Sequence, residues 1–122
     1  MNQADSPEPT HVAYRLLRED VHLVSVVGRL DTPGTRAIEP GFAALTAYRG
    51  WRTILDLSAV PFLSSYGLRM LISNHKVLQT NGGEMHLVGA SASVHEVLRL
   101  SGYEDLFPVH ATVDAALDAL KD

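Results

Sequence analysis

Residues 53–78 read TILDL-SAVPFLSSYG-LRMLISNHKVL, in which two apolar runs flank a turn-like segment. The first run, residues 53–57, is short and almost uninterrupted, which is typical of a central strand covered on both faces. The second run predicts a helix over residues 65–80, because its apolar side chains recur every three or four positions. Asn81-Gly82-Gly83 predicts the end of this helix, since glycine adopts the left-handed conformation of a C-cap. The expected buried stripe consists of Leu68, Leu71, Ile72 and Leu78.

Further strands are predicted on both sides of this unit. Residues 12–17 and 21–27 are rich in β-branched side chains, and the polar residues 18–20 between them predict an antiparallel hairpin. Two more strands are expected at residues 84–88 and 107–109. Strands that alternate with helices predict a single α/β domain with a mixed, mostly parallel sheet, in the order β-β-α-β-α-β-α-β-α.

The first helix is the least sharply defined element. Ile38, Phe42 and Leu45 recur at helical spacing after a predicted loop over residues 29–35. The helix either has irregular first turns or begins at Pro40, where a missing N–H costs little.

The last two helices are predicted from their capping residues. Ser93-Val94-His95-Glu96 matches the capping-box pattern and predicts the start of a helix that ends at Gly102. Thr112 is expected to cap the terminal helix.

The composition predicts one compact domain and disfavours several classes of protein. A chain of 122 residues holds one core, and we expect a disordered tail over residues 1–10 and the domain over residues 11–122. A net charge of −4 without a Lys/Arg run argues against nucleic acid and against a membrane surface as partners. The lack of cysteine, of a membrane-spanning apolar stretch and of a signal peptide predicts a cytoplasmic protein.

Functional side chains in such a sheet collect beyond the carboxyl ends of the strands. Three predicted loops lie there: residues 28–35, 58–65 and 89–93. The middle loop ends in Ser64-Ser65, at the start of a helix. One serine is expected to act as the N-cap by accepting a hydrogen bond from a first-turn amide. A serine at this place is also a good phosphoacceptor, because the free N–H groups and the helix dipole stabilise a phosphate.

Other chemistry at these loops is disfavoured. The nucleophile elbow of a serine hydrolase requires Gly-x-Ser-x-Gly, and position 63 is leucine. Asp31 and Asp56 could approach each other and hold a metal or a phosphoryl group, but Asp31 is expected instead to organise its own loop through side-chain to backbone hydrogen bonds. The six histidines show no ligand spacing. The sequence therefore predicts no metal, no cofactor and no catalytic residue.

Several segments, taken in order, resemble the anti-sigma factor antagonist family, the stand-alone members of the STAS domain class. The resemblance extends from about residue 12 to residue 120. Its segments are GRLD at 28–31, ILDL at 54–57, FLSSYGL at 62–68, NGGE at 81–84, VGA at 88–90 and LRLSG at 98–102.

The resemblance implies a bacterial regulator of transcription rather than an enzyme. In that family the unphosphorylated protein binds an anti-sigma factor serine kinase and frees a sigma factor. Phosphorylation of a serine blocks this binding, and a metal-dependent serine phosphatase restores it. Alignment through Phe62 and Gly67 implies that the phosphoacceptor is Ser65, and a weak homodimer is also expected. The implied partner-binding residues are Asp31, Ser64, Tyr66, Gly67 and Arg69.

The chain departs from the family pattern at two positions. The family loop usually reads Phe-Met-Asp-Ser-Ser/Thr-Gly-Leu, so Ser64 replaces an aspartate and Tyr66 replaces a small residue. Tyr66 is expected either at the rim, as an aromatic anchor for a partner, or flat over the Phe62 loop as packing. Two alternative functions stay open: a module that binds a nucleotide or small ligand at the same strand ends, and a scaffold that is not phosphorylated.

Overall fold

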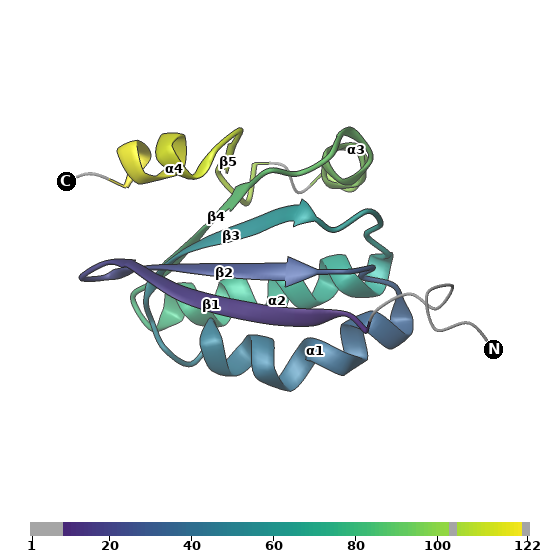
Figure 1. The fold of residues 1–122 in the computed structure, drawn as a ribbon, viewed down its shortest axis with the longest axis horizontal. Helices are drawn as coiled ribbons and strands as arrows, with labels where there is room; N and C mark the ends of the chain where they lie inside the picture. The colour runs from purple at the N-terminus through teal and green to yellow at the C-terminus, as the bar shows by residue number, and fades with distance from the viewer. Residues whose placement is uncertain (1–8, 103–104, 121–122) are drawn as a thin grey trace.

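The computed structural model describes residues 9–102 and 105–120, which form five strands and four helices in the predicted order (Figure 1). The predicted disordered tail falls mostly on residues 1–8, which lie outside the described residues. The strands are β1 (His11–Arg18), β2 (Val21–Val27), β3 (Arg52–Ala59), β4 (Glu84–Val88) and β5 (Val109–His110). The helices are α1 (Thr32–Leu45), α2 (Ser65–Thr80), α3 (Ala92–Leu100) and α4 (Val113–Ala119).

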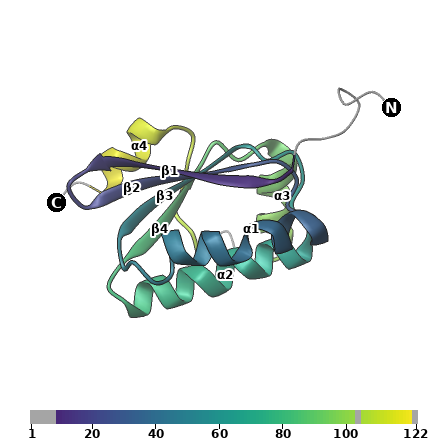
Figure 2. The same cartoon turned by 60° about the horizontal axis from the view of Figure 1, so that its bottom comes forward.

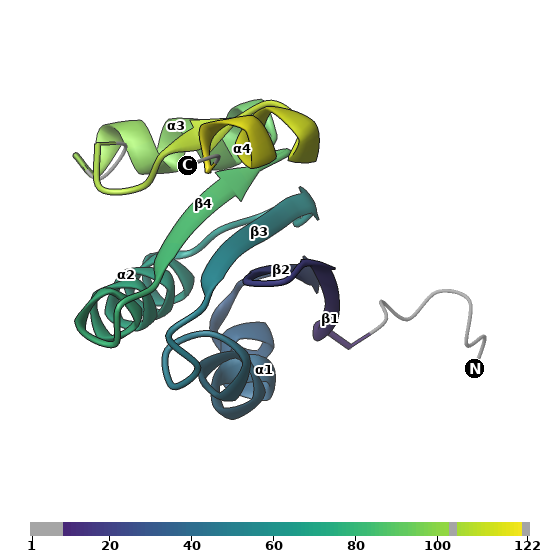
Figure 3. The ribbon, with the colours of Figure 1, turned by 90° about the vertical axis from the view of Figure 1, so that its left-hand side faces the viewer.

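The strands form one mixed sheet in the order β1-β2-β3-β4-β5. β1 and β2 pair antiparallel, as the hairpin prediction required, and the other neighbours pair in parallel. α1 and α2 lie side by side on one face of the sheet, and α4 lies on the opposite face (Figures 2 and 3). Since β2, β3 and β4 run parallel and each leads into a helix, the starts of α1, α2 and α3 gather at one edge.

The core lies on both faces of the central strand β3. Leu55 and Leu57 belong to the cluster under α1 and α2, whereas Ile54 belongs to the cluster that packs against Ala116 of α4. This alternation is the two-residue period of a strand. Ile54 and Leu55 are fully buried, so the prediction of a strand covered on both faces is confirmed.

Of the two predicted alternatives for the first helix, a start at Pro40 is wrong. α1 begins at Thr32, because Asp31 caps it by accepting a hydrogen bond from the Gly34 N–H at 2.8 Å. Pro33 occupies the first turn, where its missing N–H has no intrahelical partner to lose. Pro40 lies inside the helix on its exposed side. The predicted loop over residues 29–35 therefore ends at Asp31, and the local role predicted for that carboxylate is confirmed.

Two predictions in the C-terminal half also need correction. Ser91, not Ser93, caps α3 by accepting from the Val94 N–H at 3.2 Å, and Glu96 pairs with Arg99 instead of completing a capping box. The fifth strand begins at Val109 rather than at residue 107, because Phe107 is buried in the main core. The predicted boundaries of α2 and the Thr112 cap of α4 are confirmed.

The buried face of α2 includes more residues than the apolar stripe predicted from the sequence. The predicted stripe is buried, but Met70, Asn74 and His75 are buried as well. Asn74 donates to the Met70 carbonyl at 2.8 Å. Neither ring nitrogen of His75 has a hydrogen-bond partner of good geometry among the described residues, and its ring lies 4.7 Å from that of Phe107. Burial lowers the pKa of His75, and the nearby backbone of Leu106 offsets only part of this effect.

His75→Leu is expected to raise the free energy of unfolding by about 1 kcal/mol at neutral pH, because it removes two buried ring nitrogens without partners. Because the folded pKa of His75 lies below its unfolded value of 6.5, the unfolded chain binds the proton first, and the free energy of unfolding falls as the pH drops below that value. The parent protein should therefore lose stability on acidification, and the variant should lose less.

Denaturant unfolding at a series of pH values, from about 7.5 to about 5, measures both effects. Some pH dependence should persist in the variant, because burial also lowers the pKa of His22 and His110. His11→Gln, at an exposed position, is the control. Parallel curves for the parent and His75→Leu would contradict the prediction.

Candidate functional site

The loops after β2 and β3 are joined by backbone hydrogen bonds at the edge where the helices begin. Leu30 and Leu63 form an isolated parallel bridge. The Leu30 N–H donates to the Phe62 carbonyl at 2.9 Å, and the Ser64 N–H donates to the Leu30 carbonyl at 2.9 Å. The predicted convergence of these two loops is confirmed.

The two adjacent serines have different environments. Ser64 is the N-cap of α2: its Oγ accepts from the Gly67 N–H at 3.0 Å and donates to the Leu30 carbonyl at 2.6 Å. Ser65 is the first residue of the helix, and its side chain is exposed. Its hydroxyl makes no hydrogen bond within residues 9–102 and 105–120. The Ser64 hydroxyl therefore holds the loop together, and the Ser65 hydroxyl is exposed to solvent.

Gly67 is the point of closest approach between α2 and the loop after β2. A Cβ at this position would lie 2.8 Å from the Leu30 carbonyl oxygen and 2.9 Å from the Leu30 Cβ. Both distances are too short for a side chain, and Gly67 is buried. Gly67 thus lets the helix start sit directly on the loop.

Tyr66 links α2 to α1. Its hydroxyl donates to Glu39 Oε1 at 3.0 Å, and its side chain is only partly exposed. The ring of Phe62 is covered by a different side chain, because the Arg29 guanidinium lies 4.5 Å from its centroid. Sequence reasoning missed both Glu39 and Arg29, since no local spacing relates either residue to the serine loop.

A hollow of about 410 Å³ opens beside Ser65, along α2. Leu68 and Ile72 form its apolar part, and Arg69 and Lys76 contribute two positive charges. Both cations are exposed. Ser73 and Ser101 complete the described lining.

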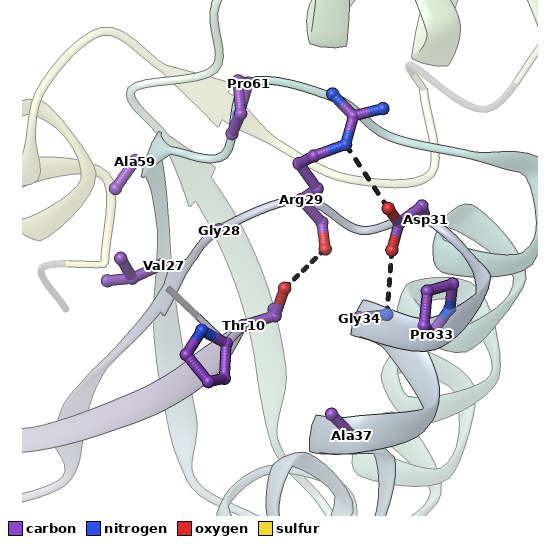
Figure 4. A pocket seen from close by; sticks show the side chains of 11 residues that line it. Thr10, Val27, Gly28, Arg29, Asp31, Pro33, Gly34, Ala37, Ala59 and Pro61 are labelled. Atoms are coloured by element: carbon purple, nitrogen blue, oxygen red, sulfur yellow. Dashed lines mark hydrogen bonds and ion pairs between the residues drawn. The ribbon is translucent and has the colours of Figure 1, made fainter. Parts of the chain in front are cut away.

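A second and larger hollow, of about 620 Å³, lies over the loop after β2 (Figure 4). Asp31 closes one side of it, accepting from the Gly34 N–H at 2.8 Å and from Arg29 Nε at 3.3 Å. Thr10 donates to the Arg29 carbonyl at 2.8 Å, which ties the start of β1 to the same loop. Its apolar lining includes Val27, Pro33, Ala37, Ala59 and Pro61.

Asp31 and Asp56 make separate local contacts. Asp56 Oδ1 accepts from the Ser58 N–H at 2.9 Å, while Asp31 caps α1. Within the described residues, no group of three or more histidine, aspartate or glutamate side chains is arranged to hold a metal ion. The same part of the chain contains no helix with the length and apolar character needed to cross a membrane.

The sequence pattern of the STAS domain family matches residues 17–116, which include the whole serine loop and most of the sheet. This chain belongs to the STAS domain family. It is 32% identical over 94 residues to BtrV of Bordetella bronchiseptica, which is provisionally named an anti-sigma factor antagonist. That match covers 77% of this STAS protein and 81% of BtrV.

Solved structures of anti-sigma factor antagonists share the fold. The crystal structure of one from Mycobacterium paratuberculosis superposes with a TM-score of 0.77 at 30% identity, covering 91% of this chain and 95% of that one. The antagonist SpoIIAA in its unphosphorylated form gives a TM-score of 0.72 at 19% identity, covering 89% and 95%. SpoIIAA from Bacillus in its phosphorylated form superposes with a TM-score of 0.66 at 18% identity, and the match covers 90% of this chain and 99% of that one. The predicted resemblance to anti-sigma factor antagonists is confirmed.

Ser64→Ala is expected to destabilise the STAS domain by about 1–2 kcal/mol, because the helix loses its cap and the loop loses a bond to Leu30. Ser65→Ala should change the free energy of unfolding by less than about 0.5 kcal/mol, because this exposed hydroxyl makes no internal contact. Denaturant unfolding of the two variants measures this difference. Equal effects would contradict the prediction, and a larger loss in Ser65→Ala would show that the cap is assigned to the wrong serine.

Proposed function

We propose that this STAS domain protein is a partner-switching regulator. In its unphosphorylated form it binds an anti-sigma factor serine kinase in the cytoplasm, and phosphorylation of Ser65 ends that binding. The observation that carries the proposal is that the two neighbouring hydroxyls differ: one is hydrogen-bonded and the other is exposed. Ser64 forms the helix cap, whereas Ser65 is exposed at the first position of the helix.

The relatives support this proposal. BtrV and the Mycobacterium paratuberculosis protein are both named as anti-sigma factor antagonists. SpoIIAA exists in a phosphorylated and an unphosphorylated form, and both have the fold of this chain. Such STAS antagonists are not normally catalytic, so the enzymes of the cycle are the partners: the serine kinase and a metal-dependent serine phosphatase that regenerates the free hydroxyl.

A phosphate at Ser65 changes charge without disturbing the core. It adds roughly −1.5 to −2 charge at neutral pH. The start of α2 presents the positive end of its dipole, which stabilises an exposed anion by about 0.3–1 kcal/mol. Ser65 is exposed, so the phosphate displaces no buried side chain. The modified protein should therefore keep its fold and change only the surface that a kinase contacts.

The proposed contact surface surrounds the serine loop. Arg69 and Tyr66 are the side chains of this set that a partner would touch directly. Ser64 and Gly67 act by fixing the serine loop. Asp31 acts indirectly, because it follows Leu30 in the loop after β2 that contacts the serine loop. Arg29 and Phe62 extend the same surface, because the stacked pair lies next to the loop and Phe62 is 40% exposed.

A second candidate function is binding of a small ligand in the larger hollow. Its volume of about 620 Å³ and its mostly apolar lining are typical of small-molecule sites. A thermal shift screen against ATP, GTP and their diphosphates separates this candidate from a switch that responds to protein partners. Size-exclusion chromatography across a concentration series tests the weak homodimer.

Phosphorylation by the cognate kinase is expected at Ser65 and not at Ser64 or Tyr66. Ser64 Oγ is engaged on both sides, and the Tyr66 hydroxyl is bonded to Glu39, so both are poorer acceptors than the free hydroxyl. Incubation with the kinase and ATP, followed by fragmentation mass spectrometry, locates the phosphate. Ser65→Ala should abolish incorporation, and phosphate found mainly at another position would overturn the assignment.

Tyr66→Ala is expected to weaken kinase binding by about tenfold or more, because a partly exposed tyrosine beside the switch serine is a typical interface anchor. Tyr66→Phe should keep most of the affinity and cost about 0.5–1 kcal/mol of stability, since it removes only the bond to Glu39. Calorimetric binding and denaturant unfolding measure the two quantities. If Tyr66→Ala loses stability but keeps full affinity, the ring serves packing alone.

A further inference from the structure

The start of α2 leaves few backbone donors for a phosphate on Ser65. The Gly67 N–H is taken by Ser64 Oγ at 3.0 Å, and the Leu68 N–H is taken by the Ser64 carbonyl at 2.9 Å. The first turn therefore offers the amides of Ser65 and Tyr66. A phosphate carries three strong acceptor oxygens, so the two amides leave acceptor capacity for a side-chain donor or for water.

Arg69 is placed to supply those donors. It lies four residues after Ser65, and side chains at this spacing are neighbours on a helix, with about 5–6 Å between their Cβ atoms. Both residues line the same hollow, so they face the same side of α2. Arg69 is exposed and has neither an ion-pair partner nor a hydrogen-bond partner among the described residues.

We propose that Arg69 is an intramolecular receptor for a phosphate on Ser65. This inference rests on the proposed function, which makes Ser65 the acceptor. The planar guanidinium donates two parallel N–H bonds to phosphate oxygens, which a lysine cannot reproduce. The anion precedes the cation along the helix, which is the favourable order for a pair four residues apart.

The surroundings favour this pair. Leu68 and Ile72 border it with apolar surface, and no described residue that lines the hollow is acidic. The acidic side chains on the neighbouring helices already have partners, because Glu39 accepts from the Tyr66 hydroxyl and Glu96 pairs with Arg99. The second cation of the hollow, Lys76, lies two turns beyond Arg69 along α2.

The pairing explains how one modification changes the whole hollow. Without phosphate, Arg69 and Lys76 present two positive charges to a partner in a chain whose net charge is −4. With phosphate, the Arg69 guanidinium turns to the helix start and its charge is compensated. A partner segment whose carboxylates bind Arg69 would lose that cation and also meet a new anion.

The test uses protein with phosphoserine incorporated at position 65 during synthesis, so it requires no kinase. A ³¹P NMR titration from about pH 4.5 to 8.5 gives the second pKa of the phosphate, which is about 6 without special contacts. A nearby cation favours the dianion and lowers that pKa. Arg69→Gln should therefore raise it, by about 0.3–0.7 of a pH unit.

Lys76→Gln is the matched control, because it removes the same charge from the same hollow at a greater distance. It should shift the phosphate pKa by less than a third of the change in Arg69→Gln. The phosphate pKa in Arg69→Lys should lie between those of the parent and of Arg69→Gln, because lysine keeps the positive charge and loses the two parallel N–H donors of the guanidinium. An unchanged pKa in Arg69→Gln, or equal shifts in the two glutamine variants, overturns the proposal. A kinase that modifies another residue would overturn the proposed function and leave this titration unaffected.

Discussion

The short backbone bridge between Leu30 and residues 62–64 determines the geometry of the whole site. The Leu30 N–H donates to Phe62, and its carbonyl accepts from both the amide and the hydroxyl of Ser64. These bonds hold the loop after β2 against the loop after β3 at the point where α2 begins. Because Leu30 is fully buried, an unpaired amide or carbonyl there would be costly. The bridge, the Ser64 cap and the missing side chain at Gly67 therefore depend on one another.

This constraint fixes the position of Ser65, the proposed phosphoacceptor. Ser65 follows directly after Ser64, which makes four hydrogen bonds through its backbone and side chain, whereas the Ser65 hydroxyl makes no hydrogen bond within the described residues. A charge added at such a position acts on the surface and leaves the packing unchanged. The Arg29 guanidinium over Phe62 and the Tyr66 hydroxyl bonded to Glu39 add side-chain contacts beside the serine loop, which would lower the ordering cost for a proposed partner.

The order of strands and helices could be predicted because each strand or helix carries its own periodicity. The strand at residues 53–57 and the helix over residues 65–80 have strong local signals. Errors arose where a local signal competed with burial. A proline at position 40 resembles a helix start, but Ile38 and Phe42 are buried on one face of a helix that Asp31 had already capped. Phenylalanine is common in strands, but Phe107 packs in the core against His75 instead of pairing in the sheet.

The sequence by itself determined the fold class, the serine loop and the local hydrogen bonding of Asp31, because these depend on residues close together in the chain. It left open which serine is the cap, since both stand next to the helix start and both can accept a hydrogen bond. Only the tertiary structure decided this, because Ser64 Oγ also bonds to Leu30, which is 34 positions away. The same reason applies to the partners of Tyr66 and Phe62. Glu39 lies on α1 and Arg29 lies in the loop after β2, so the fold brings both to the site from distant positions in the chain, and no short-range sequence pattern predicts these contacts.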